Sequence, residues 1–482
     1  MVTGQKITSN TTWYLLALII QKLFSFIYFT LLARHLGPTH YGQYQLALSF
    51  AMMLSVISDF GLSAVLIREI AKKQIDEHRL FSQIFSLKLI LGLLTAIIII
   101  GLDWLLYANN IVRPLIYLTT LIVIIDSFTL TFYGFIRGRQ NLFYESIGTM
   151  LFQLIIMIAG LLVMRFNSQL YPFILVILSA STFNLIFSAY LLFKKYHLRL
   201  KLYLDRPFVK EIFLITWPFA LSAVFAKIYA YIDSLLLEGM RGATQLGYYS
   251  VAYKITFAFQ FIPLAFVAAL YPALSHYWQN DKDRLAQALT KAIHYLSFIA
   301  WPIALGITSL GGVIITKLYT VHYLNSILPL QILILSLPFL FVNFALSYFL
   351  NATDRQIINT RNLGLVMLSN IILNLFLLKS WGAVGASLAS SLSTILLFIL
   401  NLTAVCQVIK LGFSVWRPVL LSIIAAGLMA LLVWSMSDLV SVFINIALAI
   451  ITYLLLMIIF GNIGKADWQY LKSALKKRGG DA

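Results

Sequence analysis

The chain has 482 residues, of which 61% are hydrophobic and 11% are charged, and its formal net charge is +18. Soluble domains carry about 25% charged residues, so this composition excludes an ordinary soluble protein and indicates a polytopic membrane protein. A single cysteine, Cys406, excludes an intramolecular disulfide. The seven histidines show no metal-ligand spacing and no Walker A sequence is present. We therefore expect no metal centre, no cofactor and no ATP hydrolysis.

The predicted elements are membrane-spanning helices, each of which needs about 20 apolar residues. Fourteen candidate spans follow one another with short connections, and the predicted fold class is all-α. In chain order they lie at 12–33, 42–67, 83–107, 114–136, 146–166, 171–193, 212–236, 247–271, 291–315, 328–351, 359–378, 382–405, 415–436 and 439–460.

The basic residues predict the orientation of the chain. An even number of spans puts both termini on the same side, and cytoplasmic segments are enriched in Lys and Arg. Most of the 35 lysines and arginines fall in the segments that share a side with the termini. We therefore predict cytoplasmic termini and a multi-pass protein of a bacterial or archaeal inner membrane. Topology explains the basic charge, and no nucleic-acid partner is needed.

An internal repeat connects two distant parts of the chain. The stretch around Lys22 matches the stretch around Lys227 without a gap when one is shifted by 205 residues. Paired repeats around a midplane site are common in secondary transporters. The matching pairs are Lys22/Lys227, Ile27/Ile232, Leu31/Leu236, Leu32/Leu237, Gly37/Gly242, Thr39/Thr244, Gly42/Gly247, Tyr44/Tyr249 and Ala47/Ala252. We expect the four paired glycines to form tight turns between the first two helices of each repeat.

The repeat predicts the domain organisation. Six spans precede the recurrence, so the two repeats have the same direction in the membrane and are related by an axis along its normal. We predict a six-helix bundle at 1–193, a basic cytoplasmic linker at 194–211, a second six-helix bundle at 212–405, two additional transmembrane helices at 406–460 and a basic cytoplasmic tail at 461–482. The linker contains the alternating run LRLKL at 198–202, and we expect it to lie against anionic lipid.

Seven ionisable residues lie at membrane depth in this topology: Lys22, Asp59, Lys88, Asp126, Lys227, Asp233 and Lys254. Each central charge costs about 2.5–3.5 kcal/mol, so it must pair, reach the interface, or face a wet cavity. Four of these residues lie nearer the span ends, and we expect them to reach the interface: Asp59, Lys88, Asp233 and Lys254. The three deepest residues, Lys22, Asp126 and Lys227, are candidates for a cavity or substrate role, with a buried structural pair as the alternative.

Cations at this depth suit an anionic substrate, such as a phosphate or pyrophosphate. Lys22 and Lys227 are the predicted substrate-binding residues, and Arg34 adds a cation at the outer end of the first helix. Asp126 and Asp59 are candidates for coupling to a proton or sodium gradient, or for pairing with the lysines. The sequence leaves these two roles open, and it offers no catalytic residue.

Four short motifs resemble the polysaccharide flippases of the Wzx type, within the multidrug/oligosaccharidyl-lipid/polysaccharide exporter superfamily. They are LGPTHYGQY at 36–44, DFGLS at 59–63, REIA at 68–71 and GYYSVAYK at 247–254. The resemblance implies two six-helix bundles in a V-shaped, alternating-access carrier. It also implies a polyprenyl-pyrophosphate-linked oligosaccharide as cargo, with its glycan in a wet cavity and its prenyl tail in lipid. A polysaccharide polymerase and glycosyltransferases are the implied partners.

Four alternatives remain open at this stage. A lipid II flippase shares the superfamily, but its cavity is richer in arginine. A cation-coupled multidrug exporter favours an acidic cavity, which the lysines oppose. A scaffold of a polysaccharide assembly complex would not need the lysines at all. A membrane enzyme ranks low because the predicted outer loops are short, so the chain is not expected to be an enzyme.

Overall fold

The computed structural model describes residues 4–72, 76–106, 112–166, 169–436 and 440–462. Side chains are described for these ranges except at residues 4–18, 206, 211, 214, 215, 218, 219, 413 and 414. The described ranges form helices joined by short connections and contain no strand. The all-α fold expected from composition is therefore confirmed for this part of the chain. The predicted tail after residue 462 lies outside the described residues.

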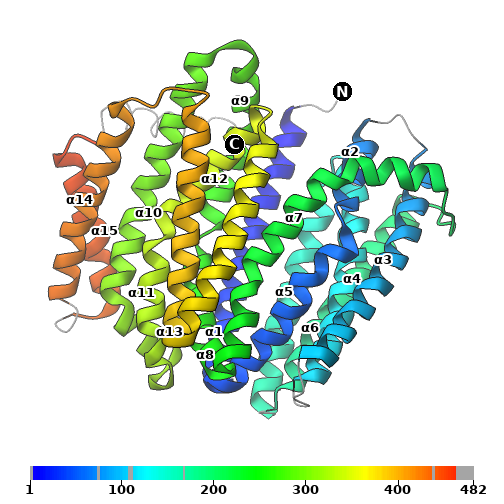
Figure 1. Ribbon diagram of the computed structural model, residues 1–482, viewed down its shortest axis with the longest axis horizontal. Coiled ribbons are helices and arrows are strands. Elements are labelled where there is room, and N and C mark those ends of the chain that lie inside the picture. The colour runs from blue at the N-terminus through cyan, green and yellow to red at the C-terminus, as the bar shows by residue number, and fades with distance from the viewer. Residues whose placement is uncertain (1–3, 73–75, 107–111, 167–168, 437–439, 463–482) are drawn as a thin grey trace. The chain divides into compact units, whose positions relative to one another are not determined.

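The helices up to residue 258 carry the first copy of the repeat and the beginning of the second (Figure 1). Their bounds are α1 (Gly4–Asp59), α2 (Leu62–Lys72), α3 (Glu77–Leu106), α4 (Arg113–Gly138), α5 (Phe143–Phe166), α6 (Tyr171–Tyr190), a π-helical turn (Leu191–Lys195), α7 (Arg206–Arg241) and α8 (Ala243–Ala258).

The remaining helices follow a short connection after α8. Their bounds are α9 (Phe261–Asn280), α10 (Lys282–Tyr319), a 3-10 helix (Val321–Ser326), α11 (Ile327–Leu335), α12 (Leu337–Ala352), α13 (Gln356–Cys406), α14 (Phe413–Ser435) and α15 (Val442–Ile459).

Two of these helices each contain two predicted spans. α1 is interrupted at Gly37 and α13 at Gly382, where the backbone leaves the helical region. By length and hydropathy, eleven helices of the described ranges can cross a membrane, or twelve if the bent pair α1 and α2 is one span. The breaks at Gly37 and Gly382 separate the spans that were predicted on either side of them.

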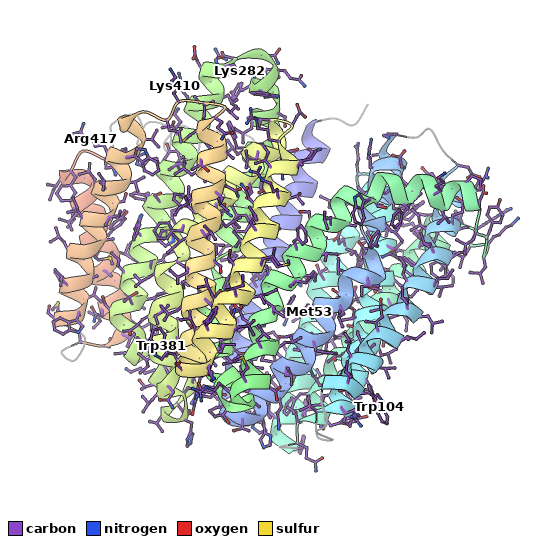
Figure 2. The ribbon with its side chains drawn as sticks, in the orientation of Figure 1. Met53, Trp104, Lys282, Trp381, Lys410 and Arg417 are labelled. Atoms are coloured by element: carbon purple, nitrogen blue, oxygen red, sulfur yellow. The ribbon has the colours of Figure 1, made fainter. Side chains whose placement is uncertain are left out.

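The chain forms two compact units. Unit 1 contains Met1–Phe261 and Thr360–Ser393, and unit 2 contains Ile262–Asn359 and Thr394–Ala482. The predicted boundaries of the two sequence repeats concern transmembrane topology, and they stay predictions. In unit 2, Lys282, Lys410 and Arg417 lie at one end (Figure 2), the end predicted to be cytoplasmic.

Unit 2 is built around α10, which packs against α12 and α14. A buried apolar cluster joins α10, α14 and α15 and includes Met429 and Met457. The hydroxyl of Tyr453 on α15 donates a 2.8 Å hydrogen bond to the carbonyl of Phe298 on α10. The two C-terminal helices are thus anchored to the rest of unit 2 by a packed core and a part-buried hydrogen bond.

In unit 1 the linker after α6 is bound along α3. The backbone N–H groups of residues 199, 201 and 203 donate to the side chains of His78, Ser82 and Ser86, at 3.2, 3.1 and 3.1 Å. Two residues of extended chain advance about 6.6 Å and four residues of helix about 6.0 Å, so the two spacings match. Leu198 is buried in the core cluster of α2, α3 and α4. The sequence suggested a linker on the lipid surface and missed this attachment to α3.

The two copies of the repeat have the same unusual backbone at one position. Gly37 has φ 70° and ψ 171°, and Gly242 has φ 83° and ψ 169°. This region is accessible only to glycine. The prediction that Gly37 and Gly242 turn the chain between consecutive helices is therefore confirmed.

The prediction of tight turns was wrong for Gly42 and Gly247, which lie inside helices α1 and α8. Both mark a close crossing of the two helices. A Cβ atom on Gly42 would lie 1.8 Å from the carbonyl oxygen of Ala243, and one on Gly247 would lie 2.0 Å from that of Pro38. Between them, the Oγ1 atoms of Thr39 and Thr244 are 2.8 Å apart. The repeats therefore contact each other through equivalent residues, and we call this contact the glycine crossing.

We predict that Gly42→Ala lowers the free energy of unfolding by about 1–3 kcal/mol, because the added methyl group meets backbone atoms that cannot rotate away. Gly239→Ala is the matched control. Gly239 lies in α7, and a Cβ atom added there would meet nothing within 4 Å, so alanine should be neutral or stabilise by about 0.5–1 kcal/mol. Thermal unfolding in detergent measures both variants. Equal midpoints for the two would contradict the close crossing.

Candidate functional site

Three lysines lie at a common depth in unit 1, on α1, α7 and α8. Lys22 and Lys227 each precede their repeat glycine, Gly37 or Gly242, by 15 residues, which is about 22 Å of helix. Lys254 follows Gly242 by 12 residues, about 18 Å. The glycine crossing holds the two glycines at one level, and α1, α7 and α8 pack against one another. The three lysines therefore lie on neighbouring helices at similar distances from the glycine crossing.

The surroundings of the lysines are aromatic. The Nζ atom of Lys254 lies 4.1 Å from the ring centroid of Phe29 on α1, and that of Lys227 lies 5.6 Å from the ring of Tyr231. Cation–π contacts of this kind stabilise a charge only partly. Lys22 is exposed, and Lys227 and Lys254 are half-buried. We call these three residues the lysine cluster.

The lysine cluster has little carboxylate compensation. None of its members forms an ion pair with an acidic residue within the described ranges. Lys22 lies close enough to Lys254 for the two charges to repel. Lys227 is attracted by Asp59 at longer range. Lys22 and Lys254 thus bring two positive charges close together within unit 1.

Lys254 is the member of the cluster that the sequence reasoning missed. It was expected to extend toward the interface, but in the structure it reaches across to Phe29 and lies near Lys22. The expectation was wrong because only the packing of α8 on α1 shows which way the side chain faces. One signal was available, since Lys254 ends the motif GYYSVAYK at 247–254.

Tyrosines accompany the lysines on α7 and α8. Tyr253 on α8 lies within electrostatic interaction distance of Tyr229 and of Tyr231, both on α7. The ring of Tyr253 stacks on that of Phe257 at 4.0 Å, and all four rings are half-buried. Tyrosine combines an apolar face with a hydroxyl group that needs a partner. The region around the lysines therefore offers both ring faces and hydrogen-bonding groups to a ligand.

Arg34 is not brought to the lysine cluster. It follows Lys22 by 12 residues on α1, which places it about 18 Å further along the helix, and its side chain is exposed. It lies instead beside the break at Gly37. A substrate role for Arg34 stays a prediction, and it would concern a different part of the cargo or a different stage of transport.

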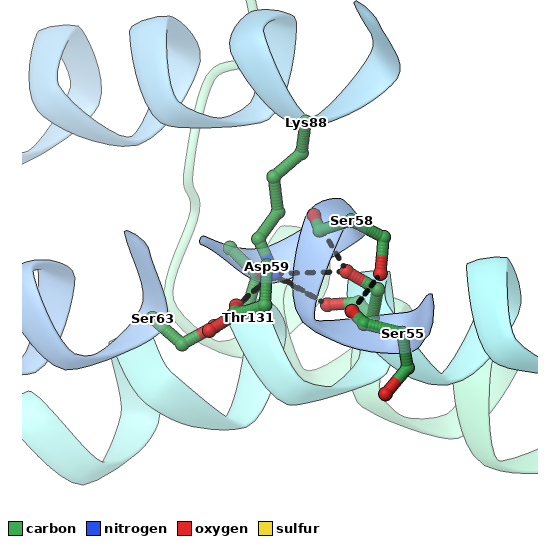
Figure 3. Close-up of polar contacts among 7 residues, drawn as sticks. Ser55, Ser58, Asp59, Ser63, Lys88 and Thr131 are labelled. Atoms are coloured by element: carbon green, nitrogen blue, oxygen red, sulfur yellow. Dashed lines mark hydrogen bonds and ion pairs between the residues drawn. The ribbon is translucent and has the colours of Figure 1, made fainter. Parts of the chain in front are cut away.

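Asp59 and Lys88 form a buried ion pair (Figure 3). The Nζ atom of Lys88 lies 2.5 Å from Oδ1 of Asp59, and it also donates to the hydroxyl of Ser63 (3.1 Å) and to the carbonyl of Ser127 (2.8 Å). The Lys88 side chain is 0% exposed, whereas that of Asp59 is 24% exposed. The expectation that Lys88 reaches the interface was wrong, because its partner lies on the neighbouring helix end.

Asp233 is also held in a buried network. The hydroxyl of Tyr249 donates to Oδ2 of Asp233 at 2.8 Å, and the side-chain amide of Asn374 donates to Oδ1 at 2.7 Å. Asp233 is 3% exposed, so the prediction that it reaches the interface was wrong. These bonds connect α7, α8 and α13 within unit 1. Asp126 is half-buried on α4 near Ser181 of α6, and its role stays a prediction.

We predict that Asp59→Asn lowers the free energy of unfolding by about 3–5 kcal/mol, because it leaves the buried charge of Lys88 without its partner. The double variant Asp59→Asn with Lys88→Met removes both charges and should recover most of this loss. Chemical unfolding of the four proteins of this double-mutant cycle tests the expectation. Additive effects of the two substitutions would show that the pair does not interact.

The chain is similar to several known membrane proteins. The profile of the family described as polysaccharide biosynthesis protein matches residues 7–278, and a second profile, described as MatE, matches residues 218–376. An uncharacterized membrane protein of Methanocaldococcus jannaschii is 24% identical over 426 residues, 83% of each chain. The capsular polysaccharide biosynthesis protein CapF of Staphylococcus aureus is 21% identical over 387 residues, covering 80% of this chain and 95% of CapF.

Among solved structures, the lipid II flippase MurJ in its inward closed conformation matches with a TM-score of 0.78 at 17% identity, over 93% of this chain and 98% of MurJ. This likeness confirms the predicted polytopic fold. Together the matches support a multi-pass membrane protein that works as a flippase or transporter. The first profile covers more than half of the chain, including the lysine cluster. The chain belongs to the polysaccharide biosynthesis protein family, among the polysaccharide flippases of the multidrug/oligosaccharidyl-lipid/polysaccharide exporter superfamily.

Proposed function

We propose that the protein is an alternating-access flippase that moves a polyprenyl-pyrophosphate-linked oligosaccharide from the cytoplasmic to the outer leaflet. One observation carries this proposal. Lys22, Lys227 and Lys254 lie at one depth on three mutually packed helices and have no acidic partner at ion-pair distance in the described part of the chain.

The energetic argument concerns the cost of these charges. Each costs about 2.5–3.5 kcal/mol at the membrane centre unless something compensates it. Lys88 and Asp233 show that this chain can satisfy an intramembrane charge with its own residues. The lysine cluster is left without such partners, so a multivalent anion is the ligand that fits it. The pyrophosphate of a lipid-linked sugar is such an anion.

The tyrosines fit the other part of the proposed cargo. Tyr231 lies beside Lys227, and Tyr253 lies near Tyr229 and Tyr231, so aromatic rings and hydroxyl groups extend from the lysines along α7 and α8. A glycan presents hydroxyl groups and weakly polar ring faces, so it can contact such a surface. The prenyl chain would stay in the lipid. CapF, a relative over most of the chain, carries capsular polysaccharide biosynthesis in its name, which agrees with this cargo.

Coupling to a proton or sodium gradient belongs to the same proposal, with Asp126 and Asp59 as the candidate residues. Asp59 is the stronger candidate, because it contacts Lys88 and also attracts Lys227 of the cluster. We further propose that both termini are cytoplasmic and that the protein works beside a polysaccharide polymerase and glycosyltransferases. Membrane lipids are the second partner.

A lipid II flippase is the second candidate function, because the fold match to the lipid II flippase MurJ covers nearly all of both chains. Lipid II would place the same pyrophosphate on the lysine cluster. The two functions therefore differ in the glycan, and a transport assay with both cargoes separates them. Export of cationic drugs fits poorly, because a positive cluster repels them.

We predict that replacing Lys22, Lys227 or Lys254 by Gln lowers transport of a fluorescent short-chain polyprenyl-pyrophosphate oligosaccharide about tenfold at subsaturating cargo. The reason is the loss of one charge-assisted hydrogen bond to the pyrophosphate. Proteoliposomes that contain each variant provide the measurement. Lys201→Gln is the matched control, since Lys201 is an exposed lysine of the linker. Lysine-to-arginine variants should keep most of the transport.

The outcomes separate the flippase from its site. Transport by wild type that is unchanged in all three variants would keep the flippase and overturn the lysine cluster. Transport of lipid II in place of the oligosaccharide would favour the second candidate. No transport of either cargo, with an imposed ion gradient and a working control flippase, would contradict both and favour a scaffold.

A further inference from the structure

A pocket in unit 1 lies away from the lysine cluster. It has a volume of about 420 Å³ and is formed by α2, α3 and the beginning of α7. These three helix ends meet at one end of unit 1 (Figure 1). In the predicted topology this end is cytoplasmic. The pocket includes Arg68 and Glu69 of the motif REIA at 68–71, to which neither the fold nor the proposed transport assigns a role.

The floor of this pocket contains a buried polar group without a partner. Gln83 on α3 is 1% exposed. Neither the nitrogen nor the oxygen of its side-chain amide has a hydrogen-bond partner among the described residues. A buried amide that makes no hydrogen bond destabilises a protein, so such groups are rare in native structures and a bound ligand or ion is one explanation for them. Gln83 offers two donors and an acceptor to a ligand in the pocket.

The charges around the pocket favour an anion. The Nζ atom of Lys72 lies 2.8 Å from Oε1 of Glu69, whereas Nε of Arg68 lies 3.7 Å from the same oxygen, beyond hydrogen-bond distance. Nη2 of Arg79 lies 3.2 Å from Oδ2 of Asp205. Three cations thus face two carboxylates, and one positive charge remains uncompensated. Arg68 is the cation with the weakest pairing, and its planar guanidinium suits a phosphate group.

The remaining walls are apolar. Leu80 on α3 and Ile212 on α7 are buried, and Phe208, which packs against the same apolar cluster, is half-buried. A site that combines basic side chains, a buried amide and apolar walls fits a ligand with a phosphate ester next to hydrocarbon. Anionic lipids concentrate basic segments at the cytoplasmic surface of a membrane. A phospholipid therefore matches the pocket: its phosphate would pair with the excess positive charge, its headgroup oxygens would bind the amide, and its hydrocarbon would contact the apolar walls.

We propose that the pocket of α2, α3 and α7 binds the phosphate ester of an anionic phospholipid, with Arg68 on the phosphate and Gln83 hydrogen-bonded to a headgroup oxygen. Lys72 and Arg79 contribute positive charge. The bound lipid bridges the end of the first two spans and the start of the second repeat. This site is separate from the cargo site, so it does not depend on which cargo the protein moves.

The test compares thermal unfolding of the purified protein in dodecyl maltoside with phosphatidylglycerol, with phosphatidylcholine, or with no lipid. Gln83→Leu removes the unpaired amide, so without lipid it should unfold at the same temperature as wild type or higher. Phosphatidylglycerol should raise the unfolding midpoint of wild type, and it should raise the midpoint of Gln83→Leu much less. Arg68→Gln should bind phosphatidylglycerol about tenfold more weakly than wild type, as measured by lipid titration in native mass spectrometry.

Two matched controls accompany these variants. Gln45 is 6% exposed, and its amide donates a 2.8 Å hydrogen bond to the hydroxyl of Tyr41. Gln45→Leu should therefore lose stability with or without lipid, unlike Gln83→Leu. Lys201→Gln removes an exposed cation from the linker and should leave the response to phosphatidylglycerol unchanged.

Soluble phosphate esters distinguish the source of the phosphate. Stabilisation of wild type by glycerol 3-phosphate as strong as that by phosphatidylglycerol, and lost in Arg68→Gln, would assign the site to a soluble phosphate ester. Equal responses of wild type to phosphatidylglycerol and phosphatidylcholine would overturn the proposal. So would a Gln83→Leu variant that is destabilised without lipid and still responds to phosphatidylglycerol like wild type.

Discussion

The close crossing of α1 and α8 is the contact on which the rest of unit 1 depends. At Gly42 and Gly247, each helix passes so near the carbonyl of the other repeat that a side chain would not fit. Small residues permit such backbone approach between helices in membranes, where packing rather than hydrophobicity drives association. Because equivalent residues make the contact, it aligns the repeats in depth. The alignment brings Lys22 and Lys227 to one level and puts Lys254 near Lys22.

The intramembrane charges of this chain are handled in two ways. Lys88 and Asp233 are each surrounded by partners from neighbouring helices, so that their cost is met inside the protein. The lysine cluster has aromatic neighbours but no ion pair within the described ranges. This fold can therefore bury a charge together with partners that neutralise it, but the described part of the chain provides no such partners for the lysine cluster. A charge that the protein leaves open is one that a ligand can compensate.

The depth of a residue along a span could be predicted from the sequence, whereas the direction in which its side chain points could not. A residue's position along a span fixes its depth, so the spans, the repeat and the depth of Lys22 and Lys227 followed from counting residues. Which helix a side chain meets depends on packing. The pairing of Lys88 with Asp59, the turn of Lys254 toward Phe29 and the crossing at Gly42 join helices that no periodicity connects. No sequence pattern could have shown that the amide of Gln83 is unpaired, because the sequence does not say whether a glutamine side chain finds hydrogen-bond partners.

Asp59 links the structural and the functional charges. It forms the ion pair with buried Lys88, and it also attracts Lys227 of the lysine cluster electrostatically. An anion bound at the cluster would compete with Asp59 for Lys227, whereas a proton or sodium ion on Asp59 would leave Lys227 more strongly attracted to that anion. Such effects are reciprocal, since each ligand changes the affinity for the other by the same factor. One carboxylate near two lysines would thus link cation binding at Asp59 to anion binding at the lysine cluster without direct contact between the two ligands.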